Sequence, residues 1–240
     1  MKKRVFVIVA VFMFISSFAV FFYPVFGNWR SANIHAELLA QYEEDIADIH
    51  EYHVEALFLR ANEVNMYLRQ LEPEQPLEIG TIANLPEDYT QILNINDIMG
   101  HIEIPAINVN LPIFHSTSDE VLERGVGHLE GTSFPVGGEG THSALTAHSG
   151  LPTARMFTDL EDLIYGDVFF INVLNRRLAY EVDQILVVYP HEIESLRIIP
   201  GEDLVTLITC TPYGRNHLRL LVRGRRIPYY DEGAEEENEQ

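Results

Sequence analysis

The chain has 240 residues, 47% of them hydrophobic and 22% charged, which is the composition of a globular protein rather than a disordered one. Its net charge of −20 argues against a nucleic-acid partner, because a phosphate backbone is bound through clustered Lys and Arg. The single cysteine cannot form an intrachain disulfide, so the core alone must hold the fold. Part of the acidity is local, and we expect residues 229–240 to form an acidic, solvated tail.

An uncharged apolar segment, residues 5–26, follows the basic sequence MKKR. A helix of about 20 apolar residues spans a bilayer, so residues 1–30 are predicted to form a cytoplasmic stub and a single-pass anchor. The basic residues before the segment place the N-terminus in the cytoplasm and the rest of the chain outside the cell. A cleaved signal peptide is the alternative, but its apolar core would be shorter, and no A-x-A-like cleavage site follows in YPVFGNWRS.

Residues 31–97 are predicted to form a helical juxtamembrane region. Apolar residues from Ile34 to Leu71 have helical spacing, which indicates one long helix or two shorter ones, with Asn33 as the N-cap. Residues 74–97 contain helix-breaking prolines and are interpreted either as a linker or as a segment that lies over the next domain in the manner of a lid.

Short β-runs separated by Gly, Pro, Asn and Asp fill residues 98–228. The expected strands are HIEI (101–104), NVNLPIF (108–114), SALTAH (143–148), DVFFINV (167–173), LAYEVDQILVVYP (178–190), LVTLITC (204–210) and HLRLLVRG (217–224). With a single short helical stretch near 156–163, this density predicts a mainly-β, closed or nearly closed barrel rather than a βαβ sheet.

The only cysteine, Cys210, ends the run VTLIT at the turn signal TPYG. Strand ends at loops are where reactive groups reach solvent, and an idle exposed thiol outside the cell would be a liability. If TPYGRN connects two antiparallel strands, Arg219 returns towards Cys210. A guanidinium there favours a thiolate and suits a developing oxyanion. A buried structural cysteine is the alternative interpretation.

A cysteine nucleophile also needs a proton donor for its leaving group, and several histidines compete for that role. His148 ends the run ALTAH at a second turn, and His142 would share its face on a regular strand. His217 lies seven residues after the cysteine. Spacing alone does not choose among them.

TLITCTPYG followed by LRLLVRG resembles the active-site signature of the sortases, and most closely of the class C, pilus-assembling sortases. That signature is a TLxTC strand, a TPYGxN loop and an arginine on the following strand. Upstream, GVGHLEGTSFPVGG and HSALTAHSGLP resemble further blocks of the family. The resemblance covers about Met99 to Arg226.

The resemblance implies an eight-stranded sortase-type β-barrel with short helices, preceded by a transmembrane helix and a helical N-terminal extension. It implies that His148 is the catalytic histidine, Cys210 the nucleophile and Arg219 the essential arginine. Thr209 and Thr211, which flank the cysteine, are weaker candidates for substrate binding. The implied reaction is transpeptidation: the thiolate cleaves an LPXTG-like sorting signal, and an amine, most simply a pilin lysine, resolves the thioacyl enzyme.

The chain departs from the class C pattern at three places, one of which is its acidic end, where class C members often have a C-terminal membrane segment. Class C members usually carry a lid with an Asp-Pro-aromatic motif, whereas residues 74–97 contain no Asp-Pro and PEDY (86–89) has a different order. Leu218 also stands directly before the arginine where the family commonly has a histidine. A sortase that uses a peptidoglycan amine is therefore an alternative. A secreted cysteine protease and a non-catalytic membrane-tethered domain are the alternatives from other classes.

The expected partners are LPXTG-type surface proteins or pilin subunits, an amine acceptor, and the membrane through residues 5–26, with no nucleic acid. The expected location is the cell membrane, with an extracellular catalytic domain. No cofactor and no metal are expected. His50 and His53 could share a helix face, but no convergent third ligand is evident, which favours a solvated face over a metal site.

Overall fold

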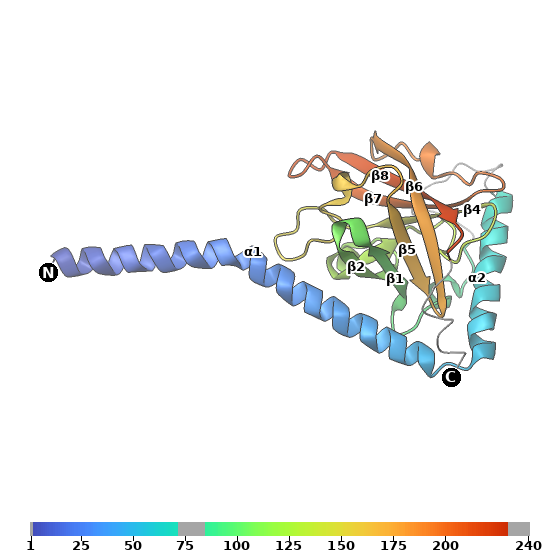
Figure 1. Cartoon of the computed structure of the whole chain (residues 1–240), viewed down its shortest axis with the longest axis horizontal. Coiled ribbons are helices and arrows are strands. Elements are labelled where there is room, and N and C mark those ends of the chain that lie inside the picture. The colour runs from blue at the N-terminus through green and yellow to red at the C-terminus, as the bar shows by residue number, and fades with distance from the viewer. Residues whose placement is uncertain (1, 72–84, 230–240) are drawn as a thin grey trace.

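The computed structural model describes residues 2–71 and 85–229. Within them, eight strands close into a barrel in the order β1-β2-β3-β4-β7-β8-β6-β5 (Figure 1). The strands are β1 (Ile98–Ile104), β2 (Val109–His115), β3 (Val126–His128), β4 (Thr141–Thr146), β5 (Val168–Val173), β6 (Arg176–Val188), β7 (Asp203–Thr211) and β8 (Leu218–Ile227). The helices are α1 (Lys2–Ala47), α2 (Glu51–Leu71), α3 (Asp119–Arg124) and the short 3-10 turns η1 (Tyr89–Gln91), η2 (Pro105–Ile107), η3 (Leu160–Asp162) and η4 (Glu194–Leu196). The predicted fold class is confirmed.

Seven of the eight strands were predicted, with ends that differ by a few residues. The strand that was not predicted, β3, has only three residues, so it offers too little alternation of apolar and polar positions to be recognised. The helical stretch expected near 156–163 contracts to η3, a single 3-10 turn. The β2–β3 and β4–β7 pairs are parallel, and every other pair in the barrel is antiparallel.

The strands bury apolar residues on both faces around β7. Val205 and Leu207 contribute to the main core inside the barrel. Ile208 belongs instead to a second cluster on the outer face, which we call the outer cluster. Its members are Leu129, Ala144, Leu196, Ile208 and Leu221, with Leu186 and Val188 packed against them. Because neighbouring residues of a strand point to opposite faces, Cys210 shares the outer face with Ile208.

Helix α1 runs without interruption from Lys2 to Ala47, so it crosses the boundary expected near residue 30. Asn33 is not an N-cap: it lies inside α1 and donates its side-chain amide to the Trp29 carbonyl at 2.9 Å. The physical reason is that the apolar helix never ends before it, so no free helix N-terminus exists there to cap. Among the described residues, α1 is the one helix long and apolar enough to cross a membrane.

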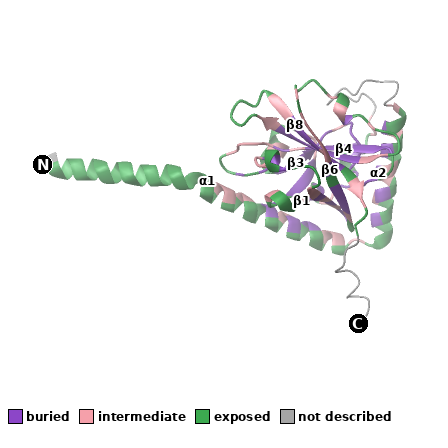
Figure 2. Ribbon diagram, turned by 45° about the horizontal axis from the view of Figure 1, so that its top comes forward, coloured by how far each residue is buried: buried purple, intermediate pink, exposed green. Residues whose placement is uncertain are grey.

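The two halves of α1 differ in their surroundings (Figures 1 and 2). Residues 3–26 are exposed and extend away from the barrel, as a membrane segment would. The second half lies along the barrel and buries Leu39 and Tyr42. The Tyr42 hydroxyl donates to the Met99 carbonyl and accepts from the Leu174 amide, both at 3.0 Å. These two bonds join α1 to the barrel.

Helix α2 packs an apolar stripe against the barrel, formed by Val54, Phe58, Ala61, Val64 and Leu68. Their spacing of three and four residues is that of one helix face. Within the stripe, the Asn65 side chain accepts from the Phe134 amide at 2.7 Å and donates to the Phe134 carbonyl at 3.1 Å. These paired bonds hold α2 in one register on the barrel.

The possible lid lies in part outside the described residues, since 72–84 are not among them. The described remainder, 85–97, packs into the barrel core through Tyr89, Ile92 and Leu93. Tyr89, the aromatic residue of PEDY, is 3% exposed and stacks on Phe134 with ring centroids 4.8 Å apart. Its ring therefore belongs to the core.

Candidate active site

Cys210 and Arg219 are direct cross-strand partners in the antiparallel β7–β8 pair. Side chains that stand opposite each other in such a pair project from the same face, with Cβ atoms about 4.5–5.5 Å apart. The sequence VTLITC-TPYGRN-HLRLLV folds this way because two β-branched and leucine-rich runs flank a turn with Gly214 and Asn216 at positive φ. The turn therefore brings Arg219 back beside Cys210, as the sequence predicted.

The Arg219 guanidinium contacts carbonyls of its own turn. One of its terminal nitrogens donates to the Asn216 carbonyl at 3.2 Å and to the Leu218 carbonyl at 3.1 Å. Within residues 2–71 and 85–229, no carboxylate forms an ion pair with Arg219. A guanidinium offers five N–H donors, so donors remain for an oxygen that lies over Cys210.

His148 lies on the other side of Cys210, just beyond the end of β4. The parallel β4–β7 register pairs Thr146 with Ile208, and its continuation by two residues brings His148 opposite Cys210. Backbone bonds support this continuation, because the Ala147 amide donates to the Ile208 carbonyl at 3.1 Å. His148, Cys210 and Arg219 are each half-buried, and they lie at or just beyond the neighbouring ends of the adjacent strands β4, β7 and β8.

Polar side chains around the cysteine fix the backbone there. The Thr209 hydroxyl is buried and donates to the Ala147 carbonyl at 2.8 Å. The Ser149 hydroxyl donates to the Cys210 carbonyl at 2.7 Å. Both bonds link the strand of the histidine to the strand of the cysteine. The Thr209 hydroxyl is thus used in a bond to Ala147, the residue that follows β4. Thr211 is half-buried and lines the hollow at Cys210.

A small hollow opens at Cys210. Its walls are Ser149, Thr158, Glu161, Thr209, Cys210, Thr211, Tyr213 and Leu220. Sequence reasoning did not single out Ser149, Glu161 or Tyr213 as residues of the site. Ser149 could have been noticed because it follows His148 directly, whereas Glu161 reaches the site through the fold of a long loop and leaves no local signal. Within the described ranges, no group of three His, Cys, Asp or Glu side chains is arranged to hold a metal ion.

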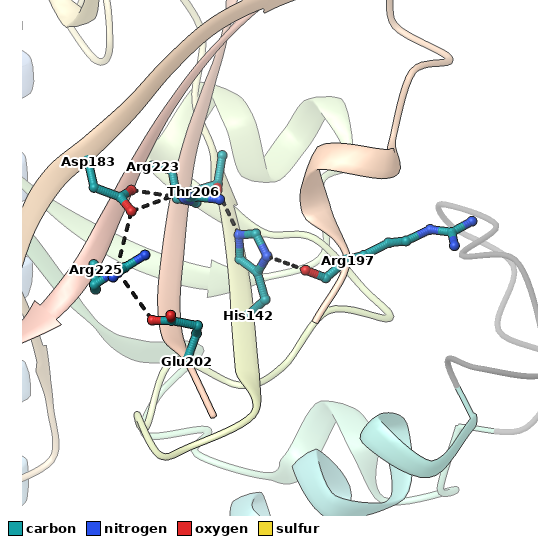
Figure 3. Close-up of polar contacts among 7 residues, drawn as sticks. All are labelled: His142, Asp183, Arg197, Glu202, Thr206, Arg223 and Arg225. Carbon is teal, nitrogen blue, oxygen red and sulfur yellow. Dashed lines mark hydrogen bonds and ion pairs between the residues drawn. The ribbon is translucent and has the colours of Figure 1, made fainter. Parts of the chain in front are cut away.

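The two other candidate histidines lie elsewhere. His217 is exposed in the turn. His142 is 1% exposed, and its Nδ1–H donates to the Arg197 carbonyl at 2.9 Å, so its Nε2 accepts from the Thr206 hydroxyl at 2.7 Å (Figure 3). Burial lowers the pKa of His142 to about 4, the Arg197 carbonyl opposes this change, and the Arg223 charge adds to it. His142 is therefore a neutral structural residue.

Figure 3 shows two neighbouring sets of polar contacts: the bonds of His142 to Arg197 and Thr206, and the ion pairs around Asp183. Arg223 donates to both Asp183 oxygens, at 2.8 and 2.9 Å, and joins β8 to β6. Arg225 bridges Asp183 and Glu202 at 3.4 and 3.3 Å. Along β7, Thr206 is followed by Ile208 of the outer cluster and then by Cys210. Leu196 of η4 packs into the same cluster.

Solved structures of class C sortases share this architecture. Streptococcus agalactiae sortase C1 is 42% identical with a TM-score of 0.76, over 82% of this chain and 100% of that one. Streptococcus pneumoniae sortase C is 42% identical with a TM-score of 0.73, over 80% of this chain and 97% of that one. The fold is therefore that of a sortase, and its neighbours among solved structures are class C sortases.

Sequence comparison agrees with the fold. The sortase domain model matches residues 102–227, which is more than half of the chain. Sortase A from Bacillus anthracis is 24% identical over 93% of this chain and 95% of that protein. The chain belongs to the sortase family, whose members are cysteine transpeptidases.

Proposed function

We propose that the chain is a membrane-anchored class C sortase that cleaves an LPXTG-like sorting signal and joins it to an amine, most simply a lysine of a pilin subunit. The observation that carries the proposal is the cross-strand pair of Cys210 with Arg219, beside the strand end of His148. A thiol, a permanent cation and an imidazole at one strand edge meet the needs of acyl transfer from an amide.

In the first half-reaction the Cys210 thiolate attacks the threonyl carbonyl carbon of the sorting signal. The new C–S bond forms while charge develops on the carbonyl oxygen, and Arg219 donates hydrogen bonds to that oxygen. The C–N bond then breaks, and the His148 imidazolium protonates the departing glycine amine. The product is a thioester on Cys210 and a neutral imidazole.

In the second half-reaction an amine attacks the thioester carbonyl. The neutral imidazole of His148 takes a proton from the attacking nitrogen, the C–S bond breaks, and Cys210 leaves as a thiolate. The result is an isopeptide bond when the amine is a lysine side chain. An amine must win over water at this step for the reaction to be a transpeptidation.

The class C assignment favours a pilin lysine as the acceptor. Streptococcus pneumoniae sortase C, whose structure was described in terms of pilin substrate specificity, is 42% identical to this chain. The alternative acceptor is a peptidoglycan amine. It draws on the match to Bacillus anthracis sortase A, which is lower in identity at 24%. The two acceptors can be compared directly by offering each amine to the same protein with the same donor peptide.

The test uses the purified full chain in detergent micelles, an LPXTG-type peptide and intact-mass measurement. We expect a thioester adduct that passes to a lysine-containing pilin peptide more readily than to a cross-bridge amine. Cys210→Ala should give no adduct. His148→Ala should give little, while His217→Ala, a change at an exposed neighbouring histidine, should react as the natural chain does. An adduct that yields only free acid would point to a protease, and equal labelling of Cys210→Ala would refute the proposal.

A further inference from the structure

Helix α1 touches the barrel first at Gly27. The residues before it, 3–26, are exposed, and Gly27 is the first partly covered one. A Cβ added to Gly27 would lie 2.8 Å from the Cα of Thr153 and 3.4 Å from the Pro152 carbonyl oxygen. Cβ atoms do not approach backbone atoms this closely, so α1 and the loop meet main chain to main chain. Only glycine allows that approach.

The partner of Gly27 is the loop that follows His148, residues 149–157, which we call the histidine loop. Two hollows are lined by residues of both α1 and the histidine loop. One is lined by Phe26, Arg30 and Thr153 among others, and the second by Trp29, Arg155 and Met156 among others. The close contact between the helix and the loop is that of Gly27 with Pro152 and Thr153.

The other end of the histidine loop is bonded to the candidate active site. The Phe157 amide donates to the His148 carbonyl at 3.0 Å, which closes the loop on the histidine itself. A β-bridge between Leu151 and Ala154 makes the part that meets α1 a compact turn. Phe157 is fully buried, so the loop is fixed at its base as well as at its tip. A shift at Thr153 is therefore passed along the loop towards His148.

The same loop also borders the cysteine turn. The Gly150 amide donates to the Thr158 hydroxyl at 3.0 Å. A Cβ on Gly150 would lie 2.8 Å from the Tyr213 ring, so the loop packs against the turn that joins Cys210 to Arg219. One side of the histidine loop thus faces the reacting groups, and the opposite side faces α1.

We propose that α1 is a brace for the active site: Gly27 docks on Thr153, holds the histidine loop, and so sets the position of the His148 imidazole against Cys210. Gly27 is then a positioning residue that acts through His148. The inference rests on the proposed function, because it assigns the brace to the histidine of that reaction. A displacement of about 1 Å in a reacting group can lower a rate about a hundredfold, so a small shift of the loop has a large effect.

The test uses the full chain in lipid nanodiscs, with Gly27→Ala and Gly27→Leu as the changes. Alanine favours a helix over glycine by about 1 kcal/mol, so a loss in Gly27→Ala cannot come from a weaker helix. Ala40→Leu is the matched control, because Ala40 is an exposed position of the same helix and the change adds similar bulk. Two readouts are taken: amide hydrogen exchange over residues 149–157, and kcat and KM for cleavage of a sorting peptide.

We expect exchange in the histidine loop to rise tenfold or more in Gly27→Leu, less in Gly27→Ala and not at all in Ala40→Leu. We expect kcat to fall by tenfold or more in Gly27→Leu with KM changed less than threefold, since orientation rather than binding is lost. Unchanged exchange in Gly27→Leu would refute the brace. Raised exchange with unchanged kcat would refute its link to His148. Exchange needs no substrate, so it decides on the brace even if the natural chain forms no thioester.

Discussion

The buried His142 predicts a defined acid sensitivity of the barrel. Its neutral imidazole joins the loop carbonyl of Arg197 to the Thr206 hydroxyl of β7, and burial lowers its pKa from 6.5 to about 4. Arg223 and Asp183 face it with opposite effects on that pKa. Because the folded-state pKa lies below the unfolded one, the stabilisation is complete above pH 6.5. It is lost as the pH falls towards 4.

The size of this effect follows from the two pKa values. At about 1.4 kcal/mol per pH unit, a shift from 6.5 to about 4 contributes roughly 3 kcal/mol, of which about 2.5 kcal/mol is lost by about pH 4.5. The change that isolates it is His142→Gln, which cannot take up a proton. This variant starts less stable at pH 7.5, by about 1–3 kcal/mol, because its hydrogen bonds fit less well.

The assay is urea unfolding followed by far-ultraviolet circular dichroism, on the chain from residue 28 onward, at several values between about pH 7.5 and 4.5. The unfolding free energy of the natural chain minus that of the variant should fall by about 2.5 kcal/mol across this range, so that the variant equals or exceeds the natural chain in stability at about pH 4.5. Other titrating groups, including the buried His128 with its pKa of about 4, are present in both proteins and cancel in the difference. A gap that stays constant with pH would refute the reasoning.

Three further changes test other contacts. Arg219→Lys keeps the charge but loses the planar guanidinium, so thioester formation should slow by about a hundredfold or more. Arg215→Ala, a change at an exposed residue of the same turn, should leave the rate within twofold. Equal rates for Arg219→Lys and the natural chain would contradict the role of Arg219 at the oxyanion. Asn65→Leu leaves the buried Phe134 amide without its acceptor, while the Phe134 carbonyl keeps the Val136 amide as a donor, so the urea unfolding free energy should fall by about 1–3 kcal/mol. A loss below about 0.5 kcal/mol would contradict the docking of α2. Thr209→Val removes the donor to the Ala147 carbonyl and should cost about 1–2 kcal/mol in the same assay, with Thr209→Ser recovering most of it; no recovery would mean that the methyl group, not the bond, matters.

The pairing of Cys210 with Arg219 could be predicted from sequence because it is local. Two strand-like runs flank one recognisable turn, so their register follows from the turn itself. The approach of His148 is different. It depends on a parallel β4–β7 pair between segments about 60 residues apart, and periodicity carries no information on which distant strands meet. Only the resemblance to known sortases chose His148 over His142 at that stage.

The N-terminal part was predicted in kind but not in form. The apolar segment and the helical pattern after it were both evident in the sequence. That they form a single helix was not, because Asn is a preferred N-cap residue and Asn33 suggested that a new helix begins there. Its neighbours decide otherwise: an apolar helix that is already formed continues through a residue of modest propensity. The contact of Gly27 with Thr153 had no sequence signal, since it depends on where the helix meets the barrel.

An uninterrupted α1 makes the link between anchor and barrel stiff. From residue 27 to Ala47 the helix rises about 1.5 Å per residue, or roughly 30 Å, and the barrel lies along it. A flexible linker of that length would let the domain wander over a distance of about 25 Å. With the apolar half of α1 in a bilayer, the thiol instead stays at one height above the lipid. A membrane-bound donor or acceptor chain then meets the thiol at a high effective concentration if its reacting segment reaches that height. A chain whose reacting segment lies at another height meets the thiol only rarely.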